Sequence, residues 1–222
     1  MIGTLTCNRQ TFNQCSIDGE RYSAPDLDDL PYPKVDSIIR ELEKVPHVKR
    51  HFFMLTLAIC NGAMIDVLHF DKDSNIPKYQ SESPDEISLV NAAAQCGYIL
   101  RRRNMDSVTV EIFGVEQVFK VLAVLPFNSD RKRMSVMIRS LDDGQVFLLT
   151  KGADEVIYSR LAPLSEDDSI LKETRDHLNS FSVKGLRTLC LAYRTCSEDE
   201  YQQWMITFNE ASGNLERRET IV

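Results

Sequence analysis

The sequence has 222 residues, with 26 Lys or Arg and 33 Asp or Glu, so its formal net charge at pH 7 is −7. This length suits one large domain or two small ones. With 43% hydrophobic and 27% charged residues, the composition is that of a globular protein with a substantial core, which excludes disordered and fibrous chains. The acidic balance argues against a general nucleic-acid binder, because neutralising phosphates requires clustered Lys and Arg.

The longest apolar stretch, residues 52–65, is interrupted by Asn61 and Gly62. It is shorter than the roughly 20 apolar residues that a membrane-spanning helix needs, so this chain is not expected to cross a bilayer. No N-terminal segment has the pattern of a signal peptide. The six cysteines have no C-x-x-C pair and no zinc-like spacing, and are interpreted as free, mostly buried thiols in a reducing compartment.

The first predicted elements are a hairpin and two helices. An extended entry leads to a hairpin that turns at residues 18–19, and the proline-rich, acidic segment 25–33 is predicted to be a loop. Apolar residues at helical spacing predict a helix over 35–42 and a second helix over 48–60, which an Asn-Gly pair ends.

The segment that begins at Ser83 is predicted to be a helix from local chemistry. Ser83 suits the cap position, Pro84 suits the first helical position, and Glu86 stands where a capping-box carboxylate reaches back to the cap N–H. Apolar residues at helical spacing continue to Ala94, and Gly97 ends the pattern.

Strands are predicted next from alternating or continuous apolar residues, over 108–112, 118–125, 134–140 and 145–150. Short turns join them, so an antiparallel sheet is expected, because parallel neighbours would need crossover connections.

The last predicted elements are a helix over 166–184, a strand over 187–193 and a final helix. Ser197 and Glu200 form a capping box before that helix, which carries one apolar stripe of Tyr201, Trp204, Met205 and Phe208. The whole pattern predicts a single α+β domain, an antiparallel sheet with helices packed against it.

No motif of stand-alone catalysis is present: there is no Walker A loop, dinucleotide fingerprint, zincin motif or nucleophile elbow. The four histidines are scattered and are interpreted as surface or core residues. No metal site is expected in this chain.

Four other segments resemble a known family in their order and spacing. They are Ser83-Pro84-Asp85-Glu86, residues 125–135 (LPFNSDRKRMS), Lys151-Gly152-Ala153-Asp154, and residues 184–189 (KGLRTL). Together with the opening residues 3–6 (GTLT), they resemble the nucleotide-binding domain of the type IV P-type ATPases, the phospholipid flippases. The resemblance extends from Gly3 to about Ser212 and implies an α+β domain, mainly an antiparallel sheet flanked by helices, that binds ATP.

The resemblance also implies which residues bind ATP. The family's matching aromatic stacks on adenine, which would be Phe127, and the carboxylate that faces adenine would be Glu86. The lysine that lines the pocket would be Lys151, and the arginine that reaches the phosphates would be Arg187. Further candidates around these are Asn128, Ser129, Arg131, Lys132 and Gly152.

Each candidate also has a purely structural interpretation. Phe127 follows an apolar strand and could belong to the core, Glu86 could serve only as a cap, and Lys151 could be a turn residue. Arg187 could pair with any acid, and the basic run 131–133 could be a solvated edge that prevents aggregation. Gly185 is explained as a helix C-cap.

The family's phosphorylation motif is only partly matched. Its aspartate would precede Met1, so the isolated chain is expected to bind ATP without forming the phosphoenzyme. We expect residues 1–6 to be a remnant of that motif and of a first hinge, with at least Met1 added artificially. Residues 7–215 are expected to form the nucleotide-binding domain, and 216–222 a second hinge region.

In the intact protein, the resemblance implies that this domain presents the γ-phosphate of ATP to the aspartate of a phosphorylation domain, and so drives a phospholipid to the cytoplasmic leaflet. It implies Mg²⁺ bound mainly outside this chain, actuator and transmembrane domains as partners, an accessory β-subunit, and a cytoplasmic location on a multi-pass membrane protein. Two alternatives remain: a degenerate regulatory domain without transport activity, and an unrelated interaction module that exposes the helix with Trp204 and Phe208.

Overall fold

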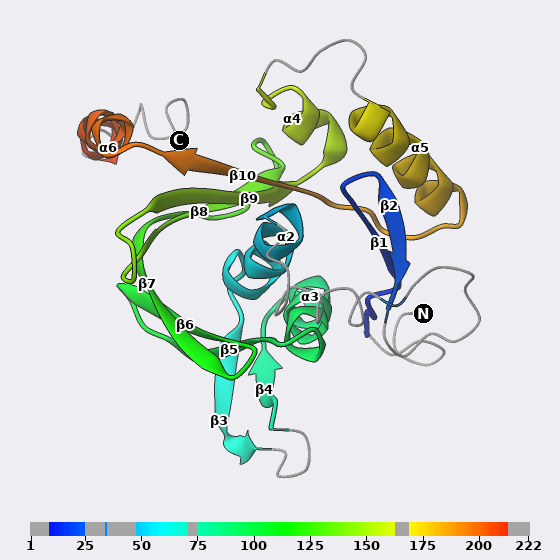
Figure 1. The fold of residues 1–222 in the computed structure, drawn as a ribbon, viewed down its shortest axis with the longest axis horizontal. Helices are drawn as coiled ribbons and strands as arrows, with labels where there is room; N and C mark the ends of the chain where they lie inside the picture. Colours follow the sequence, from blue (N-terminus) through cyan, green and yellow to red (C-terminus); the bar gives the residue numbers. More distant parts are fainter. Residues whose placement is uncertain (1–8, 25–33, 35–47, 71–74, 163–168, 213–222) are drawn as a thin grey trace.

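A curved antiparallel sheet organises the part of the chain that the computed structural model describes, which is residues 9–24, 34, 48–70, 75–162 and 169–212. Within these residues, the sheet has six strands in the order β10-β9-β8-β7-β6-β5 (Figure 1). The strands are β5 (Tyr98–Arg103), β6 (Ser107–Ile112), β7 (Val115–Leu125), β8 (Arg133–Ser140), β9 (Val146–Gly152) and β10 (Cys190–Cys196). The predicted antiparallel α+β fold is confirmed.

The two faces of the sheet are covered differently. Helices α2 (Val48–Ile59) and α3 (Pro84–Gln95) lie in the hollow of the sheet, on what we call the inner face (Figure 1). Val136 and Ile138 of β8 join the main core there, whereas Met137 between them belongs to a second, smaller cluster. Because successive residues of a strand point to opposite faces, that second cluster lies on the outer face.

The helix α6 (Glu198–Ser212) covers the second cluster. Tyr201, Trp204 and Phe208 pack against it, and the Trp204 and Phe208 rings stack with their centroids 4.7 Å apart. The apolar stripe of this helix therefore faces the sheet, which argues against the alternative of an exposed interaction helix. The short helix α4 (Asp154–Tyr158) also contacts β9 and β10.

Two small hairpins flank the sheet. The strands β1 (Gln14–Ile17) and β2 (Glu20–Ser23) contact helix α5 (Ser169–Val183), beside β10, and β3 (Met64–Phe70) pairs with β4 (Pro77–Gln80) near β5 (Figure 1). No helix within the described ranges is long and apolar enough to cross a membrane.

Most predictions from local pattern are confirmed. The first hairpin turns at residues 18–19, with positive φ at both. Helix α2 ends before Asn61, and the capping box of α6 is present: the Ser197 N–H donates to Glu200 at 2.9 Å, and the Glu200 N–H donates to the Ser197 hydroxyl at 3.2 Å. The strands β6 to β9 lie where alternation predicts them, with extended ends.

Three local predictions are wrong or incomplete. Ser83 occupies the cap of α3 with Pro84 first in the helix, but its side chain makes no cap bond. Its N–H donates to the Ser81 hydroxyl, so Glu86 is not a capping-box residue. The last strand begins at Cys190 and not at residue 187, so Arg187 precedes it.

The sequence pattern did not predict β3, β4, β5 or α4. Three consecutive arginines end β5 and break its alternation, yet Arg101 and Arg103 both find partners inside the fold. The predicted loop 25–33, the helix over 35–42 and the terminal segments 1–6 and 216–222 lie outside the described residues.

Candidate functional site

The strand ends at one edge of the sheet bring together two of the four residues predicted to bind ATP. Lys151 is next to last in β9 and pairs with Met134 of β8, on the inner face. Glu86 lies in the first turn of α3. The Lys151 Nζ atom donates to the Glu86 Oε1 atom at 2.9 Å, and only 10% and 18% of these two side chains are exposed.

Glu86 is held by three donors. Besides Lys151, two groups donate to the Glu86 Oε2 atom: the Gly62 N–H at 3.0 Å and the Ser81 hydroxyl at 2.9 Å. Burial alone would raise the pKa of this carboxyl, but the Lys151 ammonium and these hydrogen bonds outweigh it and lower the pKa below its usual value. Glu86 is therefore ionised at neutral pH, which suits a carboxylate that accepts hydrogen bonds from a ligand.

The turn after α2 supports this arrangement. The Asn61 amide donates to the Leu57 and Ala58 carbonyls at 2.9 and 3.0 Å, which caps the helix. Its Oδ1 atom accepts from the Ala63 N–H at 3.0 Å and from the Arg103 guanidinium at 3.1 Å. Gly62, between these anchored residues, thereby directs its N–H at Glu86.

Cys60 lies beneath the ion pair. Its thiol is 3.6 Å from the Met134 carbonyl and 3.7 Å from the Leu149 carbonyl. Burial raises the pKa of this thiol to about 12, although Lys151 and Arg103 lower it in part. The thiol is thus protonated, and it acts here as a weak donor and an apolar filler.

Phe127 lies in the loop between β7 and β8, at the same end of the sheet as Lys151. Its side chain is 62% exposed, so its interpretation as a core residue is wrong. Asn128 shapes the loop, because its Oδ1 atom accepts from the Arg131 N–H at 2.6 Å and its carbonyl accepts from the Lys132 N–H at 2.9 Å. Ser129 is exposed within this turn.

Gly152 has a packing role. A Cβ atom at this position would lie 2.6 Å from the Arg133 Cβ atom and 2.7 Å from the Lys132 carbonyl. The glycine therefore allows β8 and β9 to approach closely. Lys132 is exposed and pairs with Glu155 at 2.9 Å.

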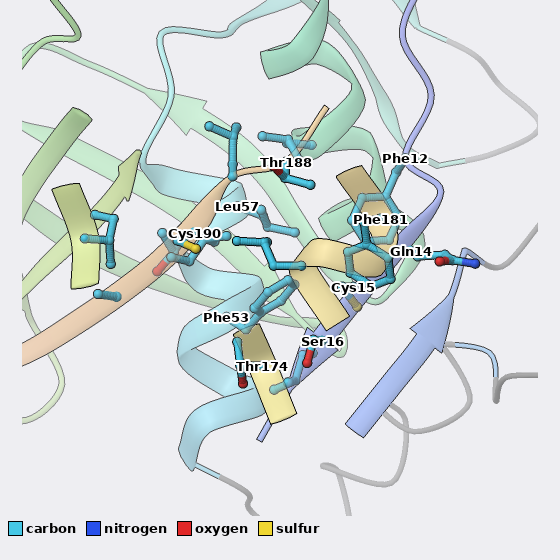
Figure 2. A pocket seen from close by; sticks show the side chains of 18 of the residues that line it. Phe12, Gln14, Cys15, Ser16, Phe53, Leu57, Thr174, Phe181, Thr188 and Cys190 are labelled. Carbon is cyan, nitrogen blue, oxygen red and sulfur yellow. The ribbon is translucent and has the colours of Figure 1, made fainter. Parts of the chain in front are cut away.

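Arg187 is exposed and lies near the start of α3. Its Nη2 atom is 3.3 Å from the Asp85 Oδ2 atom, which neighbours Glu86 in sequence. Arg187 and Asp85 also border a cavity of about 970 Å³, which lies between β1, α2, α5 and the segment that enters β10. Figure 2 shows aromatic and aliphatic side chains, including Phe12, Phe53 and Phe181, pointing into this cavity. Glu86, Phe127 and Lys151 do not line it.

The described residues hold no cluster of three or more His, Cys, Asp or Glu side chains that could bind a metal ion. The arrangement instead offers an exposed aromatic ring, an ionised carboxylate with a buried ammonium, and an exposed guanidinium at a helix start.

Comparison with known proteins identifies the family of this antiparallel α+β domain. The family model of the P-type ATPase cytoplasmic domain N matches residues 51–222. The chain therefore belongs to the family of P-type ATPase cytoplasmic N domains.

The relatives of this chain identify the branch of the family. A phospholipid-transporting ATPase of Schizosaccharomyces pombe is 40% identical over 225 residues, which cover 96% of this chain and 17% of that protein. Phospholipid-transporting ATPase IC of Homo sapiens is 37% identical over 232 residues, which cover 95% and 18%. Phospholipid-transporting ATPase 10 of Arabidopsis thaliana is 36% identical over 260 residues, which cover 99% and 21%.

The chain thus spans about a fifth of the length of these relatives. Their names describe them as ATPases, which hydrolyse ATP. The motifs indicate a resemblance to the type IV branch, and these relatives confirm it.

Proposed function

We propose that this chain is the ATP-binding domain of a phospholipid-translocating P-type ATPase. It binds ATP at the strand ends and presents the γ-phosphate to an aspartate in a phosphorylation domain of the same longer protein. The energy of forming and breaking that aspartyl phosphate then moves a phospholipid to the cytoplasmic leaflet. Such catalysis consists mainly of positioning and charge stabilisation, so a separate domain that delivers ATP is physically sensible.

The observation that carries the proposal is the exposure of Phe127 at the end of the sheet where Lys151 pairs with Glu86. The ring is 62% exposed, so its face is free to meet a ligand. One face of the ring can stack on adenine, since nucleobases stack on aromatic side chains with little regard to sequence. The loop that carries it is held by Asn128, so the ring is presented on a fixed turn.

The charged residues then have distinct roles. Glu86 accepts a hydrogen bond from the adenine amine through whichever oxygen the ligand reaches, while Lys151 keeps the carboxylate ionised and supplies positive charge. Arg187 is exposed and its contact with Asp85 is 3.3 Å long, so its guanidinium can turn to phosphate oxygens. The transport of lipid and any accessory subunit belong to parts of the protein beyond this chain.

The test is a calorimetric titration of the 222-residue chain with ATP, beside Phe127→Ala and Leu141→Ala. Leu141 is the matched control, because it is 58% exposed but lies in the β8–β9 turn, at the other end of the sheet. We expect Phe127→Ala to weaken ATP binding by about 1–3 kcal/mol, the usual value of one stacked base. Leu141→Ala is expected to leave the affinity unchanged.

GTP is the second ligand in this experiment, because its base offers a carbonyl where adenine offers an amine. Glu86 would then face an acceptor, so we expect weaker binding of GTP than of ATP. If the folded chain bound no nucleotide, or if Phe127→Ala bound ATP as the parent does, the proposal would be wrong. The degenerate regulatory domain would then be the better description.

A further inference from the structure

The two oxygen atoms of the Glu86 carboxylate have different partners. The Oε2 atom accepts two hydrogen bonds, from the Gly62 N–H at 3.0 Å and from the Ser81 hydroxyl at 2.9 Å. The Oε1 atom accepts one, from the Lys151 Nζ atom at 2.9 Å, and no second donor reaches it from the part of the chain that the structure describes. Because a carboxylate oxygen has two lone pairs, Oε2 is fully used and Oε1 has one lone pair left.

The Ser81 hydroxyl is itself oriented by its neighbours. Its oxygen atom accepts from the Ser83 N–H at 3.3 Å, at the cap of α3. An ionised carboxylate can only accept, so the hydroxyl proton lies between Ser81 and Glu86. The segment between β4 and α3 thereby connects the start of the helix to the carboxylate in its first turn.

The three donors to Glu86 come from three separate segments: the turn after α2, the segment after β4, and strand β9. The carboxylate therefore cannot rotate without losing at least one hydrogen bond to a charged group, which is among the stronger kinds. The side chain of Glu86 is 18% exposed, so a ligand can still reach it. Glu86 is thus fixed in one orientation before any ligand binds.

We propose that Ser81 is a positioning residue for recognition of the base: it keeps the Oε2 atom of Glu86 occupied, so that the free lone pair of the Oε1 atom receives the amine of adenine. The inference rests on the proposed function and deepens it, because it names the accepting atom and a residue that holds it. Ser81 acts through Glu86 and has no contact with the base.

A fixed carboxylate discriminates between bases better than a mobile one. Adenine presents an amine to the Oε1 atom, whereas guanine would present a carbonyl, so that two acceptors would face each other without a proton. A carboxylate that can rotate turns away from guanine, and it is correctly placed for adenine only part of the time. The Ser81 hydroxyl is therefore expected to strengthen the binding of ATP relative to GTP.

The experiment is a calorimetric titration of the 222-residue chain with ATP and with GTP. The measured quantity is the ratio of the two dissociation constants, GTP over ATP. We expect Ser81→Ala to lower this ratio about threefold, because Glu86 then adopts the competent orientation for only a fraction of the time. A merely structural role would weaken both nucleotides equally, and that result would overturn the proposal.

Two further variants serve as controls. Ser81→Thr keeps the hydroxyl, so it is expected to retain most of the preference for ATP. Ser88→Ala also removes a half-buried hydroxyl from the start of α3, but Ser88 donates to the Asp85 carbonyl at 2.9 Å and not to Glu86. This variant is expected to keep the ratio of the parent. An equal loss of preference in Ser81→Ala and Ser88→Ala would contradict a specific role of Ser81.

A measurement without nucleotide tests the contact itself. Burial raises the pKa of Glu86, and the Lys151 ammonium, the Gly62 N–H and the Ser81 hydroxyl together lower it. A carbon-13 NMR titration of the Glu86 carboxyl is therefore expected to show a higher pKa in Ser81→Ala than in the parent. The same pKa in both proteins would overturn the inference.

Failure of this inference is distinguishable from failure of the proposed function. If the folded parent bound no nucleotide, both would be wrong. If Phe127→Ala weakened ATP binding as expected while Ser81→Ala kept the ratio of the parent, only the positioning role of Ser81 would be wrong.

Discussion

At the scale of single residues, the contact between Lys151 and Glu86 has two duties. It holds a buried ammonium on the inner face, and it lowers the pKa of the Glu86 carboxyl. Both side chains are largely buried, and the Lys151 Nζ and Glu86 Oε1 atoms are 2.9 Å apart. A buried ion pair of this kind adds little to the free energy of unfolding compared with an apolar pair. Removing one partner, however, leaves the other charge buried and uncompensated.

We therefore expect Lys151→Met to lower the free energy of unfolding at pH 7 by about 2–4 kcal/mol. The control is Lys132→Met, because Lys132 forms an ion pair of the same length, 2.9 Å, but both partners are exposed. That variant is expected to keep nearly the stability of the parent, since exposed pairs contribute little. Urea denaturation measures both, and equal stabilities of the two variants would contradict a buried pair.

The pH dependence follows from the lowered pKa of Glu86. The unfolded chain takes up a proton near the usual pKa of 4.5, before the folded chain does. Stability from this group is therefore fully present above pH 4.5 and is lost as the pH falls through the folded pKa. Glu86→Gln is expected to flatten that part of the profile, and a profile with the same slope as that of the parent would argue against the pair.

At the scale of elements, the end of α2 depends on one side chain. Asn61 is only 2% exposed, and its amide both caps the helix and anchors Arg103. The same turn holds the Gly62 N–H that binds Glu86. Asn61 thus joins α2 to β5, and the next residue joins the same turn to α3, which no pattern along the chain would reveal.

We expect Asn61→Ala to lower the free energy of unfolding by about 2–4 kcal/mol, because two buried carbonyls, one N–H and one guanidinium lose their partner. Asn61→Asp keeps the accepting Oδ1 atom but places a carboxylate oxygen against the Leu57 and Ala58 carbonyls, so a loss at least as large is expected. Chemical denaturation measures the order of the three proteins. A smaller loss in Asn61→Asp than in Asn61→Ala would mean that the accepting Oδ1 atom contributes more than the helix cap.

At the scale of the whole molecule, the cysteines report on the integrity of the core. The five cysteines among the described residues form no disulfide and are buried, and burial raises the pKa of Cys60 to about 12 and of Cys190 to about 11. The reactive species is the thiolate, so these thiols are inert in the folded state.

A thiol-specific chromogenic reagent at pH 8 is therefore expected to modify at most one of the six thiols of the native chain rapidly, and all six after denaturation. The prediction concerns Cys15, Cys60, Cys96, Cys190 and Cys196, which are at most 9% exposed. Rapid modification of two or more thiols in the native chain would show that the sheet opens locally.

Much of the fold is predictable because it depends on neighbours in sequence. The turn at residues 18–19, the capping box of Ser197 and Glu200, and the strands β6 to β9 follow from period, turn chemistry and capping, which act over a few residues. The sequence pattern does not predict strand β5, because its three arginines have no apolar alternation and only the surrounding fold supplies their partners.

The sequence alone determined the class of fold, the resemblance to the type IV branch and the residues to examine, because these depend on composition and on local order. Only the tertiary structure decided how those residues are used. Glu86 is a capping residue by local spacing, but its carboxylate meets an ammonium 65 positions away. Arg133 and Lys151 are both basic residues near strand ends, yet the strand register places them on opposite faces of the sheet. Long-range pairing and strand register are properties of the folded chain, because they arise only when distant segments pack together.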